Sequence, residues 1–418
     1  MSDGLATARG PERGPGAAPD TAPPPLHAAV VLTVSPTGLA VARSLAPRGA
    51  VVYGVDQNRR EIGHYSRWFV RDPRIAYLPP GPELLDGLLA LGSRCERRPV
   101  LFIAGDPYIE FVAQNHERLR ERFILTDSMR PEVNSVFLNK RSFYERCLDL
   151  GVAMPVTVFP DGEAQAEEAA RRLRYPAIVK PSLGHLFRQK LHGEKLVEVG
   201  DAESLLRWWR QIRDWGGDSV LQEVVVGPET SIFVAAVYTD AQLECRSLLT
   251  ARKSRQYPPL YGSGSYVEAC WNEEIAKLSI DVVRKLGYRG ICGTEFKWDP
   301  RDRAWKLIEI NPRPVLWYGL CQAAGVDVIW DAYCDLVGRP NPAHVGVQDD
   351  RVRWQLLVRD LVSGVHFLRK KELSWREFAR TVIDPRHKTY AELSWRDPGM
   401  LWGVPMNTVW KYRSHTGG

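Results

Sequence analysis

The chain has 418 residues, which is too many for one ordinary hydrophobic core, so we expect two to four subdomains. Hydrophobic residues at 44% and charged residues at 25% describe a soluble globular protein, and no apolar run approaches the roughly 20 residues of a membrane span. The net charge of +6 is mild and we interpret the basic residues as dispersed, so the sequence does not call for a nucleic-acid partner.

The cysteines and the first residues indicate the cellular compartment. None of the seven cysteines forms a C-x-x-C pair, and several stand in apolar segments. We therefore expect reduced cysteines in a cytoplasmic protein, rather than a disulfide framework or a zinc site. Residues 1–27 are rich in Pro, Gly and Ala, contain no apolar core of a signal peptide, and are expected to be a disordered tail.

Residues 28–127 alternate strands and helices in the manner of a parallel α/β domain. After a first apolar strand, further strands are expected over Val51–Asp56 and Val100–Ala104. The strand-end Asp56 resembles the acid of a dinucleotide site, although the preceding turn offers only Gly38 where three glycines are usual. One hypothesis is therefore a nicotinamide-dependent oxidoreductase that binds its cofactor at this turn.

A polar hairpin in the last third of the chain carries the clearest candidate site. Two short strands are expected, Cys292–Trp298 and Trp305–Ile310. Because side chains alternate along a strand, Glu309 and Asn311 point the same way, and the hairpin can place Glu295 opposite them. Two carboxylates and an amide oxygen form an oxygen-only cage, which suits Mg²⁺ better than zinc.

Several cations accompany this hairpin. Arg313 follows it directly, and Lys180 ends a short apolar strand. The loop 182–195 contains glycines and basic residues, as expected of a lid over a polyphosphate. Three basic residues precede a Gly-Ser turn that is suited to an anion: Arg252, Lys253 and Arg255.

In this order the segments resemble the ATP-grasp superfamily. The matching segments are NKRSFYERCLDLGVAMP, PAIVKPS, LQEVVVGPE and TEFKWDPRDRAWKLIEINPRP, and with the leading α/β domain they cover about Ala28 to Arg339. The stretches SRQYPPLYGSGSYVE and EINPRPVLWYGLCQAAGVDV resemble the carboxylate–amine ligase branch that includes D-aspartate ligase-like enzymes more than D-alanine–D-alanine ligase or carboxylases.

The resemblance implies a fold of class α/β, with α+β lobes. A Rossmann-like pre-ATP-grasp domain with a parallel sheet (28–127) would precede a two-lobed ATP-grasp domain (128–340). Within the latter, a small lid lobe is expected at about 155–222 and a metal-binding lobe at about 223–340. Residues 341–418 would form a C-terminal appendage outside the family's motifs.

The resemblance also implies ATP and one or two Mg²⁺ (or Mn²⁺) ions between the lobes. Lys140 and Lys180 would neutralise phosphates. The strand end with Gln222, Glu223 and Val225 would contact the adenine, and Glu229 would accept hydrogen bonds from the ribose hydroxyls. The metal ligands would be Glu295, Glu309 and Asn311. Arg255 and Arg313 would contact the transferring phosphoryl group and the substrate carboxylate. Gln222 stands where many relatives have an acid, and the lid loop is less glycine-rich than usual.

The function implied is an ATP-dependent ligase that activates a small-molecule carboxylate as an acylphosphate and joins it to an amine, with release of ADP and phosphate. The alternative is a catalytically silent or regulatory ATP-binding protein with the same fold. A homodimer is left open.

The appendage interleaves tryptophans with basic residues, a pattern that also occurs in proteins that bind nucleic acids. We expect an irregular segment whose aromatic side chains pack back onto the body of the protein. The tryptophans concerned are Trp354, Trp375, Trp395, Trp402 and Trp410.

Overall fold

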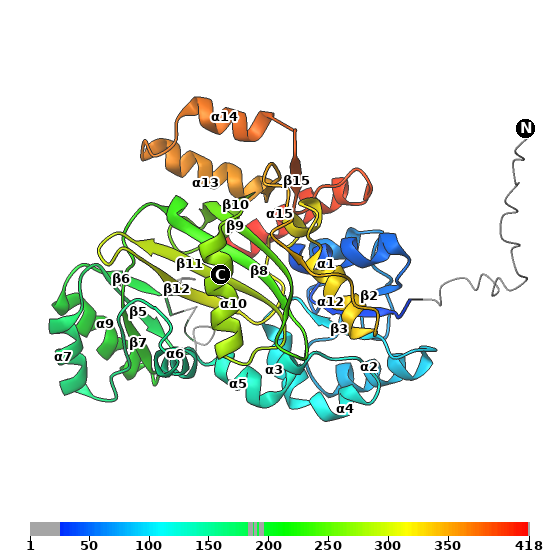
Figure 1. Cartoon of the computed structure of the whole chain (residues 1–418), viewed down its shortest axis with the longest axis horizontal. Helices are drawn as coiled ribbons and strands as arrows, with labels where there is room; N and C mark the ends of the chain where they lie inside the picture. The colour runs from blue at the N-terminus through cyan, green and yellow to red at the C-terminus, as the bar shows by residue number, and fades with distance from the viewer. Residues whose placement is uncertain (1–25, 183–186, 188–189, 192–195, 417–418) are drawn as a thin grey trace, which may run out of the picture.

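A computed structural model describes residues 26–182, 187, 190–191 and 196–416 (Figure 1). Most of the expected N-terminal tail and most of the basic loop 182–195 lie outside the described residues. In the described part of the chain the strands form three sheets. No helix in that part is long and apolar enough to cross a membrane.

The first sheet is small and parallel, with the order β2-β1-β3. Its strands are β1 (Ala29–Leu32), β2 (Val52–Val55) and β3 (Val100–Ile103). The central strand is buried on both faces, because α1 (Pro36–Leu45) packs on one side and α2 (Pro82–Arg94) with α3 (Pro107–Gln114) on the other. The helical region after β3 is divided at Asn115, where α3 ends and α4 (His116–Arg120) begins.

The second sheet is the largest and has the order β12-β11-β8-β9-β10-β14-β15, with β13 beside β9. Its strands are β8 (Ile232–Thr239), β9 (Cys245–Tyr257), β10 (Ser263–Ala269), β11 (Gly290–Asp299), β12 (Ala304–Asn311), β13 (His344–Val345), β14 (Arg353–Gln355) and β15 (Lys388–Tyr390). Strand β9 continues through the basic residues Arg252, Lys253 and Arg255 as far as Tyr257, and β10 pairs with it.

Helices cover both faces of this sheet. Ala235 and Val237 of β8 pack against α10 (Glu273–Lys285), while their neighbours Val234 and Ala236 belong to the core that includes α11 (Gly319–Ala323) and α12 (Val328–Leu336). That second core continues into α1, so the first sheet and the large sheet share buried contacts.

The third sheet has the order β4-β7-β5-β6 and lies beside the hairpin end of the large sheet (Figure 1). Its strands are β4 (Thr157–Val158), β5 (Ala177–Pro181), β6 (Val197–Val199) and β7 (Ser219–Glu223), and α7 (Glu163–Arg172) and α9 (Ala202–Asp214) pack on it. Two helices connect it to the first domain, α5 (Pro131–Leu138) and α6 (Lys140–Asp149).

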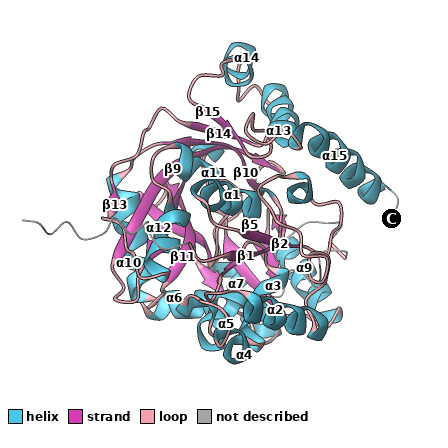
Figure 2. Cartoon of the chain, turned by 90° about the vertical axis from the view of Figure 1, so that its right-hand side faces the viewer, coloured by secondary structure: helices cyan, strands magenta, loops and turns pink. Residues whose placement is uncertain are grey.

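The C-terminal segment is helical, which corrects the expectation of an irregular appendage. It contains α13 (Leu357–Arg369), α14 (Trp375–Ile383) and α15 (Met400–Thr416) (Figure 2). Helix α13 packs on β9 and β10, whereas α15 lies against Tyr65 of the first domain. Buried Asp397 accepts hydrogen bonds from Ser66 and from the backbone of Arg67. The segment therefore contacts both the large sheet and the first domain.

Candidate functional site

The hairpin β11–β12 brings two predicted carboxylates together. Glu295 pairs directly with Glu309 in the antiparallel register, and Asn311 pairs with Gly293. Directly paired residues lie on the same face of a sheet, with Cβ atoms roughly 5 Å apart. The predicted hairpin and the opposition of its two glutamates are thus confirmed. Glu309 is exposed, and Glu295 is partly buried.

The turn of this hairpin is held by a buried acid. Asp299 accepts from the backbone and side chain of Arg301 and forms an ion pair with Lys306, 3.2 Å away. Burial would by itself raise the pKa of Asp299, but the bonds from Arg301 and Lys306 lower it below its ordinary value. The turn therefore retains a charged carboxylate that holds Arg301 and Lys306 together at the end of the hairpin.

A lysine on the next strand but one reaches the candidate metal ligand. The Nζ atom of Lys253 lies 2.8 and 2.7 Å from the two carboxylate oxygens of Glu295 and 3.0 Å from Oε1 of Gln256. The side-chain amide of Gln256 in turn donates to Glu229 at 2.9 Å. A continuous chain of polar contacts thus connects a predicted metal ligand with the residue predicted for the ribose.

Arg255 points elsewhere. Its guanidinium donates to both carboxylate oxygens of Asp360 in α13, at 2.8 and 2.7 Å, and to the hydroxyl of Thr381 at 3.1 Å. It also lies over the ring of Tyr266, 4.3 Å from its centroid, and both members of the ion pair are buried. A register irregularity in the β9–β10 ladder falls at this point, so neighbouring basic residues face different surroundings.

Lys253 is thus the cation that the structure adds to the site. In the sequence it is one of three basic residues in a short run, and that run was the only signal available. The spacing alone did not show which of the three would face the glutamates, because the irregularity in the ladder changes the alternation of side chains.

Arg313 is held by the first domain. Its Nε atom donates to Oδ1 of Asp106 at 2.6 Å, and Nη1 donates to the carbonyl of Pro314 at 3.0 Å. Asp106 lies in the loop after β3, at the carboxyl end of the parallel sheet. The predicted substrate arginine therefore stands where the first domain meets the hairpin.

Lys180 and Gln222 lie side by side on the third sheet. The ammonium of Lys180 donates to Oε1 of Gln222 at 3.0 Å and to the hydroxyl of Tyr144 at 3.2 Å, and all three residues are buried. Burial raises the pKa of Tyr144 to about 12, so this hydroxyl stays protonated at neutral pH. The charges of Lys140 and Glu309 also act on Tyr144, which places both predicted residues near this cluster.

At the strand end predicted to contact adenine, the side chain of Glu223 already forms hydrogen bonds within the protein. The carboxylate of Glu223 accepts from the backbone nitrogen and Nε of Arg174, both at 2.9 Å. Arg174 also bridges to Asp302 in the hairpin turn, with two bonds of 2.9 Å. The Glu223 side chain therefore ties the third sheet to the hairpin, which leaves backbone groups at Val225 as the candidates for base recognition.

Glu229 is also satisfied within the protein. It is buried, and besides Gln256 it accepts from the backbone nitrogen of Leu260 at 2.7 Å. A ribose hydroxyl would have to share or displace one of these donors.

The oxygen donors of the hairpin fit a magnesium ion that completes its coordination with nucleotide phosphates and water. Glu295, Glu309 and Asn311 supply two carboxylates and one amide on adjacent positions of one hairpin. Among the described residues no group of three or more His, Cys, Asp or Glu side chains is arranged to hold a metal by itself.

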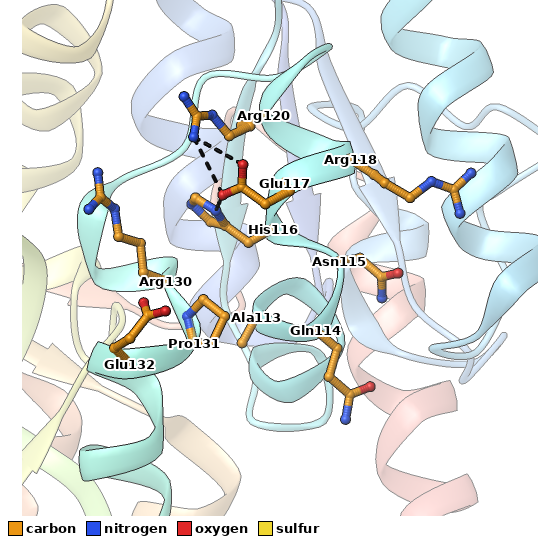
Figure 3. Close-up of a pocket in the computed structure, with 10 residues that line it drawn as sticks. All are labelled: Ala113, Gln114, Asn115, His116, Glu117, Arg118, Arg120, Arg130, Pro131 and Glu132. Atoms are coloured by element: carbon orange, nitrogen blue, oxygen red, sulfur yellow. Dashed lines mark hydrogen bonds and ion pairs between the residues drawn. The ribbon is translucent and has the colours of Figure 1, made fainter.

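A surface groove of about 380 Å³ lies away from these residues (Figure 3). It is lined by residues 113–118, 120 and 130–132, and within it Glu117 binds both His116 and Arg120. Two other lining arginines pair outside the groove, Arg118 with Asp86 and Arg130 with Asp127. None of the predicted site residues lines this groove.

The acid predicted for a dinucleotide has a structural role. Asp56 accepts from the backbone nitrogens of Val34 and Asn58 at 3.1 and 2.9 Å and is buried. These bonds close the loop after β1. In addition, a Cβ at Gly38 would lie 2.0 Å from the carbonyl oxygen of Thr33, so helix α1 approaches this loop closely. Both observations weigh against the oxidoreductase hypothesis.

Comparison with known proteins identifies the central domain. Residues 137–315 match the model of the ATP-grasp domain. The chain contains an ATP-grasp domain. The resemblance inferred from the motif order is thereby confirmed, as is the fold class.

The chain is 26% identical over 250 residues to the D-aspartate ligase of Enterococcus faecium, a match that covers 56% of this chain and 58% of that protein. It is 24% identical over 172 residues to the D-alanine–D-alanine ligase of Stutzerimonas stutzeri, covering 40% of this chain and 52% of that one. The chain thus spans little more than half the length of these curated relatives.

Solved structures show the same fold. The N5-carboxyaminoimidazole synthetase of Staphylococcus aureus complexed with ADP has a TM-score of 0.61 at 14% identity, covering 77% of this chain and 80% of that chain. The biotin carboxylase domain dimer of the Hydrogenobacter thermophilus 2-oxoglutarate carboxylase, in complex with MgADP, has a TM-score of 0.60 at 15% identity, covering 78% and 73%.

Proposed function

We propose that this ATP-grasp protein is an ADP-forming ligase that joins a small-molecule carboxylate to an amine. The observation that carries the proposal is the direct pairing of Glu295 with Glu309, with the ammonium of Lys253 on the same carboxylate. This arrangement offers an oxygen-only metal site beside a fixed cation, which is what transfer of a charged phosphoryl group requires.

In the proposed reaction a carboxylate oxygen attacks the γ-phosphorus of ATP, and the bond from that phosphorus to the β,γ-bridging oxygen breaks, releasing ADP. The amine nitrogen then attacks the acyl carbon of the acylphosphate. The tetrahedral oxyanion collapses, phosphate leaves, and the nitrogen loses a proton. No protein nucleophile is needed, only placed cations and exclusion of water.

The proposed residue roles follow the contacts. Lys140 and Lys180 would neutralise the α- and β-phosphates, and backbone groups of the strand Gln222 to Val225 would contact the adenine. Glu229 would accept from the ribose. One or two Mg²⁺ or Mn²⁺ ions, held by Glu295, Glu309 and Asn311, would supply charge neutralisation at the transferring phosphate.

The contacts of Lys253, Arg255 and Arg313 support a different role for each of these cations. Lys253 touches Glu295, so we assign to it the phosphoryl contact first expected of Arg255. Arg255 is enclosed by Asp360 and would act by fixing β9. Arg313 stays our candidate for binding the substrate carboxylate. In the structure Arg313 binds the carboxylate of Asp106 instead of a substrate carboxylate.

One observation favours a second candidate, a silent or regulatory nucleotide-binding protein. Glu295 is already neutralised by Lys253, so one of the proposed metal ligands is occupied by an internal cation. In a working ligase the metal and the nucleotide would have to separate this pair.

The test is release of ADP and phosphate from Mg²⁺-ATP across a panel of amino acids, small carboxylates and amines, with D-aspartate among the acids. ADP release that depends on one acid–amine pair would establish the ligase and name its substrates. ATP binding in calorimetry without turnover for any pair would favour the silent protein. Absence of ATP binding would overturn both. The seven free cysteines agree with the proposed cytoplasmic location.

A further inference from the structure

The C-terminal helices expose an unusual amount of apolar surface. Of the sixteen large hydrophobic side chains that are exposed in the described part of the chain, ten lie beyond residue 357. The aromatic side chains there were expected to pack onto the body. Trp354 does so and is 1% exposed, but Trp375, Trp395 and Trp402 are 72%, 86% and 79% exposed, so the expectation was wrong for these three.

Helix α13 is apolar on its outer face. Its inner face carries Asp360, Ser363, Gly364 and Phe367, which are buried. The outward positions follow the i, i+3, i+4, i+7 spacing of a single helical stripe. They are occupied by exposed aliphatic residues: Val358, Leu361, Val362 and Val365.

Helix α14 repeats this arrangement. Phe378 points inward and packs against Gly364 of α13, while Trp375 and Ile383 are exposed. Arg376 and Arg380 are exposed on the same helix. Helix α14 therefore exposes apolar and basic side chains to the solvent together.

The third part of this surface precedes and begins α15. The guanidinium of Arg396 stacks on exposed Trp395, 4.9 Å from the ring centroid, and Trp402 with Met406 is exposed one turn apart. Figures 1 and 2 both show α13, α14 and α15 gathered on the same side of the molecule. We call the exposed side chains of these three helices and of residues 395–396 the C-terminal surface.

The charge of the chain is concentrated in the same segment, contrary to the even dispersal inferred from composition. Residues 351–418 contain 13 Lys and Arg against six Asp and Glu, a net charge of +7. Since the whole chain carries +6, the first 350 residues carry −1.

From this combination we propose that the C-terminal surface binds the face of a membrane that contains anionic phospholipids. Tryptophan and aliphatic side chains on a helix face partition into the headgroup boundary, and neighbouring basic residues are attracted to anionic headgroups. The helices would lie on the membrane and would not cross it.

The alternatives fit the surface less well. A second copy docking by two-fold symmetry would place two strongly basic segments against each other, which is unfavourable. Nucleic acid would satisfy the charge, but the aliphatic stripe of α13 would find no apolar partner along a phosphate backbone. An anionic bilayer satisfies both the charge and the apolar side chains.

The experiment is co-sedimentation of the full-length protein with vesicles of phosphatidylcholine, with and without phosphatidylglycerol. We expect binding only when phosphatidylglycerol is present, and weaker binding as salt is added. The variants Trp375→Ser/Ile383→Ser and Arg376→Glu/Arg380→Glu should each weaken binding about tenfold or more. Both pairs are exposed, so folding should persist.

Matched controls lie elsewhere on the surface. Leu148→Ser/Val347→Ser removes two exposed aliphatic side chains, and Arg171→Glu/Arg172→Glu reverses two exposed charges on α7. Both should bind like the wild type. The proposal is overturned if anionic vesicles do not bind the protein, or if control and C-terminal variants lose binding equally.

A dimer in sedimentation velocity that the Trp375→Ser/Ile383→Ser variant dissociates would assign the surface to a second copy instead. Binding to duplex DNA that displaces vesicles, and that is tighter than vesicle binding, would assign it to nucleic acid. None of these measurements requires ligase activity, so the proposal stands or fails separately from the proposed function.

Discussion

Lys253 and Glu295 form an ion pair across the large sheet, over the intervening strand β8, with both carboxylate oxygens within 2.8 Å of the ammonium. Their side chains are 5% and 17% exposed. The lysine and a metal ion would compete for the same carboxylate, so the pair can serve as an internal stand-in for the cation.

Replacing Lys253 with methionine should strengthen Mg²⁺ binding in the absence of nucleotide by about tenfold, because a positive charge next to Glu295 is removed. The same variant should lose ligase turnover if Lys253 contacts the transferring phosphate. Calorimetric titration with Mg²⁺ measures the first effect. Lys285→Met, at an exposed position of α10, is the control and should bind as the wild type does. Unchanged Mg²⁺ affinity in Lys253→Met would contradict the proposed metal position.

The variant Glu309→Gln should lower ATP turnover by a factor on the order of 100 or more, because one metal-binding carboxylate loses its charge. Glu309 is exposed, so the unfolding midpoint should change little. Initial rates of ADP release measure the effect. Glu273→Gln, an exposed carboxylate on α10, provides the matched control. Full turnover in Glu309→Gln would remove this residue from the site.

The ion pair of Arg255 with Asp360 should be important for stability. Asp360→Ala would leave a buried guanidinium without its carboxylate, which costs about 3–5 kcal/mol in comparable buried pairs. Urea unfolding provides the free energy. Asp384→Ala, which breaks a pair with highly exposed Arg386, should cost less than about 1 kcal/mol. Similar losses in both variants would show that Asp360 has no special role.

Glu268 should make the protein sensitive to acid. Burial would by itself raise the pKa of this carboxyl, but the hydrogen bond from Ser254 and the charges of Arg252 and Arg353 hold it below its ordinary value. A carboxyl with a lowered folded-state pKa stabilises the protein above its unfolded-state pKa, and this contribution is lost as pH falls through the folded-state value.

The stability advantage of the wild type over Glu268→Gln should therefore be present at neutral pH and shrink below about pH 4. Urea unfolding at a series of pH values checks this. An advantage that is constant over that range would show that the carboxylate charge is not involved.

The hairpin and the shared face of Glu309 and Asn311 can be predicted from the sequence, because the polar turn joins two short strands and side chains alternate along each of them. The direct pairing of Glu295 with Glu309 also needs a register shift between Glu295 and Phe296, which the sequence does not show. The order of the lysines and acids along the chain was also sufficient to indicate the ATP-grasp family. The hairpin depends on residues that are close together in the sequence, and the family depends only on the order of the motifs along the chain.

The selection of Lys253 over Arg255 could not be predicted in the same way. It depends on a register irregularity between β9 and β10 and on Asp360, which is 105 residues further along the chain. Likewise, no pattern near Glu223 indicates that Arg174 and Asp302 occupy its carboxylate. Contacts between distant segments are decided by tertiary packing, which a single sequence does not show.

The pairing of β14 with β10 has a consequence for any shortened form of the protein. Tyr266, Val267 and Glu268 are covered by the strand Arg353–Gln355, which itself is covered by β15. A chain ending before Arg353 would leave an unpaired strand edge in its largest sheet, with buried Val267 and Tyr266 beside it. Such open edges recruit strands from other molecules. The C-terminal segment thus covers the edge of the largest sheet that a shortened chain would expose to other molecules.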